Sequence, residues 1–239
     1  MQRSLLLHSH AINQAMRCLF ILLSFFILGC AKAQFTLSVS GGVNTNTISQ
    51  KRTDGYIYSN YHSGGGWQFA LQAGYNIKHW FVFTGAGISE NSFRHNVLYA
   101  PPTGSSNDTI TFHPVYLTAP VGVGYEFTLK PKVFLRLFTG FYVSEAIGGS
   151  LYQRYSTCGE VACREQPPIT QQIKYGNSFS DLSKTNAGLQ FGAAIRAWKR
   201  FEFGCTYLMG LKNINPSDIT SENIKLRTFA VDAKFYIIK

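Results

Sequence analysis

The segment Thr228-Phe229-Ala230-Val231-Asp232-Ala233-Lys234-Phe235-Tyr236-Ile237 alternates between two kinds of side chain. In an extended chain, one face carries Phe229, Val231, Ala233, Phe235 and Ile237, and the other carries Ala230, Asp232, Lys234 and Tyr236. A period of two residues predicts a β-strand with one apolar face. A strand of about ten residues that alternates apolar and charged positions is typical of transmembrane β-barrels.

Seven further segments show a related alternation, and the connections between them are long loops and short turns in regular alternation. Together with residues 225–238, the predicted strands are 35–44, 67–76, 80–89, 113–127, 132–145, 186–197 and 201–212. Short turns follow the second, fourth and sixth strands, and long polar loops follow the first, third, fifth and seventh, the longest at 146–185. The sequence therefore predicts an all-β fold, an eight-stranded antiparallel up-and-down transmembrane β-barrel with short periplasmic turns and long extracellular loops.

Composition agrees with this fold and limits the partners. The chain has 239 residues, enough for one all-β domain, and charged residues make up only 14% of it, against about a quarter in soluble proteins. The formal net charge is +10, but the basic residues are scattered without a run, so no nucleic-acid partner is expected. The expected partners are outer-membrane lipids and lipopolysaccharide, with a candidate protein partner at the extracellular loops.

The first 33 residues have the features of a secretory signal peptide. An apolar run follows Arg17, and Ala31-Lys32-Ala33 supplies small residues at the cleavage spacing. We therefore expect residues 1–33 to be removed and residues 34–239 to form the barrel in the outer membrane of a Gram-negative bacterium. Two alternatives stay open, because Met16 is a candidate start and Ile27-Leu28-Gly29-Cys30 resembles a lipidation site.

Six charged residues fall on the strand faces that point into the barrel. They are three acids and three bases, all in the turn-end halves of their strands: Glu126, Arg136, Arg196, Glu202, Asp232 and Lys234. Buried charges persist only when they are paired and hydrogen-bonded. The pattern predicts a salt-bridged network that fills the lumen at one level and argues against an open channel. The alternative is that these charges form the solvated face of a soluble sheet.

Aromatic and glycine positions also suit a narrow barrel in lipid. Aromatic residues flank the short turns, where an interface girdle belongs: Tyr75, Trp80, Tyr125, Trp198 and Phe201. Glycines at inward positions leave room in the lumen: Gly122, Gly124, Gly192 and Gly204. Phe81 and Phe83 break the pattern, because they are apolar residues on the predicted inward face.

Cys158 and Cys163 lie close together in the longest predicted loop. In an exported protein this spacing makes them a candidate disulfide. A metal-binding pair is the alternative, although no nearby histidine completes such a site. Cys205 falls on an apolar strand position and is expected to be a small buried hydrophobic residue.

Several segments carry a resemblance to a known family. The first is Tyr116-Leu117-Thr118-Ala119-Pro120-Val121-Gly122-Val123-Gly124-Tyr125-Glu126-Phe127, which resembles the YLxxPxxxxYxF strand of PorT-like outer-membrane β-barrel proteins, and Phe138-Thr139-Gly140 resembles that family's next strand. Thr84-Gly85 and the segment 207–214 are similar to its TG and YxxGLxNI segments. The resemblance implies an eight-stranded outer-membrane barrel, usually without an assigned activity. Some relatives assist secretion, but no residue here matches a secretion-specific motif, and the chain ends on Lys239 rather than an aromatic residue.

No catalytic, cofactor or metal motif is recognisable, so we expect no cofactor and no enzymatic activity. The sequence favours a structural or binding role through the extracellular loops. One alternative is a soluble periplasmic barrel that holds a small apolar ligand inside and keeps its charges outside. Another is a lipid-modifying outer-membrane enzyme that uses loop-end histidines, for which the candidates are His62, His95 and His113.

Overall fold

The computed structural model describes residues 34–51, 58–99, 105–158, 163–176, 182–198, 200–214 and 223–238. The predicted signal peptide and the alternatives at Met16 and Cys30 lie outside these residues. The described residues form eleven strands: β1 Gln34–Lys51, β2 Tyr58–Ile77, β3 Trp80–Glu90, β4 Phe93–Tyr99, β5 Ser105–Lys130, β6 Val133–Cys158, β7 Cys163–Glu165, β8 Ile169–Gln172, β9 Thr185–Ala197, β10 Phe201–Gly210 and β11 Asn223–Ile238. Among the described residues, no helix is long and apolar enough to cross a membrane.

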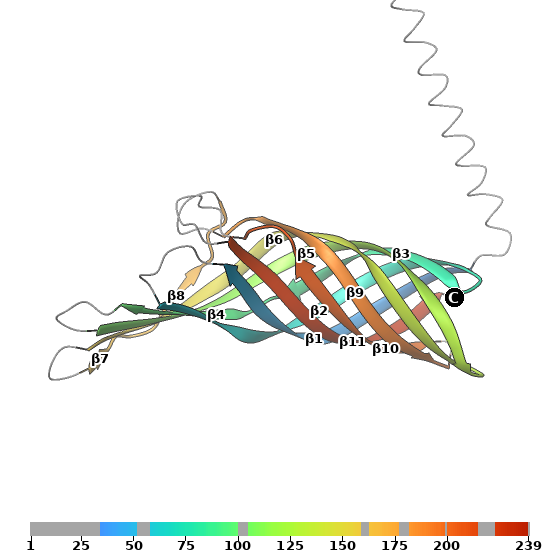
Figure 1. The fold of residues 1–239 in the computed structure, drawn as a ribbon, viewed down its shortest axis with the longest axis horizontal. Helices are drawn as coiled ribbons and strands as arrows, with labels where there is room; N and C mark the ends of the chain where they lie inside the picture. The colour runs from blue at the N-terminus through green and yellow to red at the C-terminus, as the bar shows by residue number, and fades with distance from the viewer. Residues whose placement is uncertain are drawn as a thin grey trace, which may run out of the picture.

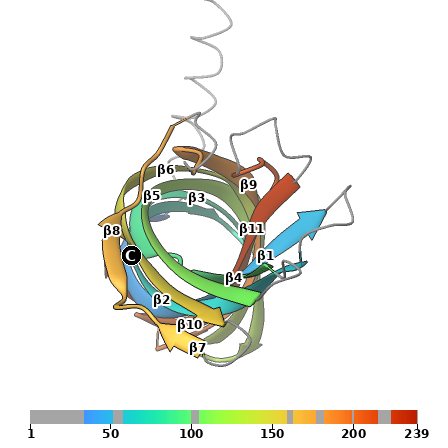
Figure 2. The same cartoon turned by 90° about the vertical axis from the view of Figure 1, so that its left-hand side faces the viewer.

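Eight of these strands close into one ring (Figures 1 and 2). Each is antiparallel to both neighbours, in the order β1, β2, β3, β5, β6, β9, β10 and β11. The first and last strands close the ring, with a register that includes Gly42↔Asp232. The predicted eight-stranded up-and-down barrel is therefore confirmed.

The outer face of the ring is apolar. In β11, Phe229, Val231 and Ile237 are 45%, 50% and 52% exposed, whereas the alternate residues Ala230 and Tyr236 are buried. Exposed Leu, Val, Ile and Phe side chains continue around the other ring strands. The alternative of a soluble periplasmic barrel is wrong on this point, because it requires the apolar face inside and the charges outside. An apolar outer surface of this kind is suited to lipid.

The three short connections lie at one end of the barrel, which we call the turn end. They join β2 to β3, β5 to β6 and β9 to β10. The predicted aromatic girdle is placed here, with Trp80, Trp198 and Phe201 exposed beside the turns. Each turn contains one non-glycine residue with positive φ: Lys78 at 56°, Lys132 at 72° and Trp198 at 50°.

At the opposite end, the loop end, the strands run further than the sequence predicts. β5 and β6 have 26 residues each, and their pairing continues from Lys130↔Val133 to Ser105↔Cys158. β4 pairs with β2 and β5, and β7 and β8 pair with β6. The predicted loops before residue 113 and after residue 145 are therefore wrong in part. We call Tyr58–Ser63, β4, residues 105–113 and 150–158, β7 and β8 the loop-end sheet, which projects from the ring in Figure 1.

An apolar cluster packs where the loop-end sheet joins the ring. Its buried members are Phe93, Tyr116, Ala146, Ile214, Ile224 and Leu226. Tyr175 packs against this cluster and donates a hydrogen bond to the Gly148 carbonyl at 2.8 Å. Burial raises the pKa of Tyr175 to about 12, so this hydroxyl stays protonated and remains a donor. The cluster gives the loop end a hydrophobic core of its own.

Candidate functional site

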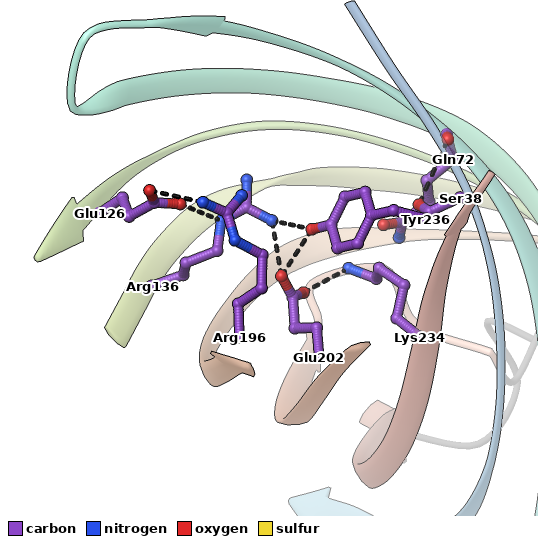
Figure 3. A network of polar contacts seen from close by, with 8 residues as sticks. All are labelled: Ser38, Gln72, Glu126, Arg136, Arg196, Glu202, Lys234 and Tyr236. Carbon is purple, nitrogen blue, oxygen red and sulfur yellow. Dashed lines mark hydrogen bonds and ion pairs between the residues drawn. The ribbon is translucent and has the colours of Figure 1, made fainter. Parts of the chain in front are cut away.

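Strand register brings charged residues together near the turn end. Glu126 in β5 lies directly opposite Arg136 in β6, and Glu202 in β10 lies opposite both Arg196 in β9 and Lys234 in β11. All five have side chains at least four-fifths buried. They alternate with outward apolar residues, so the period of two that exposes the apolar face also directs these charges into the lumen (Figure 3).

Glu202 is the most connected member of this lumen network. Its Oε2 accepts a hydrogen bond from Arg136 Nη1 at 2.7 Å and one from the Tyr236 hydroxyl at 2.5 Å. Its Oε1 accepts a hydrogen bond from Lys234 Nζ at 2.9 Å. Arg136 Nη1 also contacts the Tyr236 hydroxyl. The Glu202 carboxylate is only 3% exposed, so these three donors replace the water that it loses on burial.

Glu126 joins the two arginines on the other side of the lumen. Its Oε1 lies 2.7 Å from Arg196 Nη2, and its Oε2 lies 3.5 Å from Arg136 Nε. Arg136 therefore bridges Glu126 and Glu202. The chain Arg196–Glu126–Arg136–Glu202–Lys234 crosses the lumen as one alternating series of charges (Figure 3).

Aromatic rings support the two guanidinium groups, and one of these contacts explains the inward position of Phe81 in β3. Arg136 Cζ lies 3.6 Å from the centroid of the Phe81 ring, and Arg196 Cζ lies 4.7 Å from that of Phe134. A guanidinium over an aromatic face is attracted by the ring quadrupole. Gly124 makes room for Phe81, since a Cβ there would lie 2.3 Å from Phe81 Cζ.

Asp232, the sixth predicted residue, lies beside the lumen network. It is two residues from Lys234 on the same face and interacts with Lys234 electrostatically, without a hydrogen bond or ion pair to the described residues. Its neighbours across the strands are Gly42 and Gly204, which have no side chain to bond. Its place in the paired set stays a prediction, and Tyr236, which strand parity places on the inward face, joins the network as well.

A cavity of about 110 Å³ lies in the lumen beside the network. Polar residues such as Ser38, Gln72 and Thr118 line it, together with Phe83 and Phe138. The hydroxyl of Ser38 donates to the Gln72 carbonyl at 3.4 Å. The volume is enough for a few water molecules and far below that of a pocket for a drug-sized ligand.

The three candidate histidines do not come together in one site. His62 is exposed and lies opposite Arg94, while His95 stacks on the Tyr61 ring at 4.2 Å. His113 Nδ1 lies 2.9 Å from Ser92 Oγ and 3.0 Å from Glu90 Oε1.

The contacts of His113 differ from those of a serine hydrolase. A hydrolase places its nucleophile on one ring nitrogen and its acid on the other, whereas here both groups contact Nδ1. Ser92 is also 3% exposed and donates to Glu90 at 2.8 Å, so its hydroxyl is not presented to a substrate. The arrangement favours a structural role for His113.

The pairing register of β6 and β7 fixes where two of the cysteines lie. Cys158 in β6 lies directly opposite Cys163 in β7, so the backbone brings the predicted pair together. Their side chains lie outside what the structure describes, and the disulfide stays a prediction. Cys205 carries a free thiol on β10 and is half-buried rather than fully buried. Within the described residues, no group of three His, Cys, Asp or Glu side chains is arranged to hold a metal ion.

Comparison with known proteins identifies similar barrels. Residues 31–215 match the family described as "Outer membrane protein beta-barrel domain". The attachment invasion locus protein Ail of Yersinia pestis is 12% identical, with 85% of this chain and 99% of that chain covered and a TM-score of 0.32. Neisserial surface protein A is 13% identical, with coverage of 83% and 96% and a TM-score of 0.37. The outer membrane protein OprG of Pseudomonas aeruginosa is 9% identical, with coverage of 86% and 97% and a TM-score of 0.40. A search of curated proteins gave no significant match.

Proposed function

The chain belongs to the outer membrane protein β-barrel domain family, and we propose that it serves a structural or binding role through its loop-end sheet. In this proposal the loop-end sheet faces the exterior of a Gram-negative cell and contacts a protein partner there. The barrel anchors the sheet in the outer membrane. The resemblance of Tyr116–Phe127 to a strand of the PorT-like barrels favours a position among those relatives.

The length of β5 and β6 is the observation that carries this proposal. A barrel strand needs about 9–11 residues to cross the hydrocarbon of a membrane, and these strands have 26. The two strands stay paired through this extra length, so the sheet is a formed surface rather than a set of separate loops. Folded surfaces bind partners with a smaller loss of conformational entropy than flexible loops do.

The side chains that fill the lumen argue against transport as the main activity. The lumen network joins five charged side chains across the barrel near the turn end. The apolar cluster around Phe93 and Tyr116 packs at the loop end. In an eight-stranded barrel, side chains are expected to fill the interior. We infer that no continuous aqueous path connects the two ends.

Photo-crosslinking in living cells tests the binding role. A crosslinking amino acid placed at Arg154, Arg164 or Ile169 lies on the exposed loop-end sheet. These positions are expected to give discrete protein adducts. Phe141 and Phe203 are matched controls, because they are exposed on the apolar outer face and are expected to give lipid adducts only. The absence of protein adducts from all three sheet positions would contradict the binding role.

A further inference from the structure

We propose that the turn end of the barrel binds anionic phospholipid headgroups of the adjoining membrane leaflet. Four exposed basic side chains surround this end, Lys78, Lys130, Lys132 and Arg200, and we call them the basic rim. They come from the three turns that join separate pairs of strands. The rim is therefore spread around the barrel rather than gathered on one connection, as contact with a surrounding ring of lipid requires.

No acid offsets this charge. The segments 77–80, 127–133, 197–201 and 235–239 contain no Asp or Glu. The nearest acids along the chain, Glu126 and Glu202, point into the lumen and bind Arg136, Arg196 and Lys234. The loop end differs, because exposed Lys184 there pairs with Glu145 at 2.7 Å. The rim thus presents positive charge without internal partners among the described residues.

The position of the basic rim, next to apolar side chains on the outer face, favours lipid as its binding partner. Each turn lies beside large apolar side chains on the outer face: Ile77 and Trp80, Leu129, and Trp198 and Phe201. Trp198 is 74% exposed, and exposed tryptophans mark the boundary between hydrocarbon and headgroups. Lysine and arginine at that boundary keep their stems on apolar surface and extend their charges to the headgroup phosphates. A protein partner below the membrane would not need its basic contacts next to lipid-facing residues.

The backbone of the turns adds an independent observation. Lys78 and Lys132 have φ values of 56° and 72°, a region that favours glycine. A lysine there costs backbone free energy that glycine would avoid. Residues retained in such conformations are candidates for function. At both positions the chain has a positive charge where a tight turn alone would favour a residue without a side chain.

A measurement of lipid selectivity tests the proposal directly. The purified full chain is placed in nanodiscs that contain phosphatidylcholine and phosphatidylglycerol, and the lipids that remain bound are counted by native mass spectrometry. The wild type is expected to enrich phosphatidylglycerol, and the enrichment should fall as salt is raised. Each rim charge that is lost should weaken the preference by roughly fivefold, the factor that corresponds to about 1 kcal/mol per basic residue at an anionic surface.

The variant K78Q/K130Q/K132Q/R200Q should lose the preference, whereas K174Q/K184Q/K212Q/R227Q, which removes four exposed charges outside the turn end, should keep it. If the quadruple rim variant does not fold, K78G/K132G serves instead, because glycine suits both positive φ values. This double variant should fold at least as well as wild type and should reduce the selectivity for phosphatidylglycerol about 25-fold.

An unselective wild type, or rim variants as selective as wild type, would overturn the proposal. Binding of acidic polypeptide without lipid selectivity would also overturn it. None of these results depends on the loop-end sheet, so failure here leaves the proposed function untouched.

Discussion

At the scale of single residues, Glu202 is the side chain on which the lumen network depends, because it accepts hydrogen bonds from Arg136, Lys234 and Tyr236. Strand parity predicts that Glu202, Arg136 and Lys234 point inward, since a period of two assigns each residue to a face. Parity cannot predict which acid binds which base. That choice depends on the stagger between strands, and it leaves Asp232 beside glycines.

Removal of one charge from this network should be costly. Glu202→Gln leaves Arg136 and Lys234 without their shared carboxylate in a buried site, and it should lower the free energy of unfolding by about 3–5 kcal/mol. The measurement is urea unfolding of the barrel in lipid vesicles. Glu145→Gln is the control, because its exposed pair with Lys184 should contribute less than about 1 kcal/mol. Equal effects of the two substitutions would show that the lumen network is not structurally important.

Two glycines lie opposite each other where β5 and β6 pair. Gly122 lies opposite Gly140, and a Cβ at Gly140 would lie 2.2 Å from the Val121 carbonyl oxygen. Gly140→Ala should therefore destabilise the barrel by about 1–3 kcal/mol through overpacking. In the same strand, Gly148→Ala meets nothing within 4 Å and should be close to neutral. Unfolding of both variants, compared with wild type, checks this difference; a neutral Gly140→Ala would mean that the neighbouring backbone adjusts to the added methyl group at little cost.

At the scale of elements, the membrane-crossing parts of the strands are predictable and their loop-end extensions are not. Apolar alternation marks residues in contact with lipid, as in Phe229 to Ile237. The extensions Ser105–Phe112 and Ala146–Cys158 lie beyond the lipid-facing band and are mixed in polarity, so no periodic signal distinguishes them from loops. Pairing between neighbouring strands stabilises them, and that pairing is invisible in a single segment.

The β6–β7 hairpin provides a test of the predicted disulfide. Because Cys158 and Cys163 are opposite each other in register, oxidation in the envelope should join them. Alkylation with a maleimide reagent before reduction should then modify only Cys205, and Cys158→Ser should make Cys163 reactive as well. Modification of both residues in the oxidised wild type would rule out the disulfide, and metal-dependent protection would favour the metal-pair alternative.

At the scale of the whole molecule, two groups of side chains pack near the two ends of the barrel, charged residues at the turn end and apolar residues such as Phe93 at the loop end. The sequence predicts the first group from its balanced charges. It does not predict the second, because Phe93, Ile214 and Ile224 lie outside the predicted strands or at their edges and meet only when the ring closes.

A closed lumen predicts a lack of conductance. The purified chain in a planar bilayer should show no stable channels, because an ion would have to displace buried, paired charges. A variant that removes Arg136, Arg196 and Glu202 together, with alanine at each position, is the comparison and should be leakier if it folds. Stable openings of the wild type would contradict the closed lumen.

The most direct test of the whole account is the face of β11 that meets lipid. Single-cysteine variants at positions 229 to 237, in a background without the native cysteines, are labelled with a fluorophore and exposed to a quencher carried on lipid chains. The account predicts quenching at 229, 231, 233, 235 and 237 and none at 230, 232, 234 and 236, in keeping with the exposed and buried positions of this strand. Quenching without alternation, or quenching at the positions of Asp232 and Lys234, would contradict a barrel with its charges inside and its apolar face in the membrane.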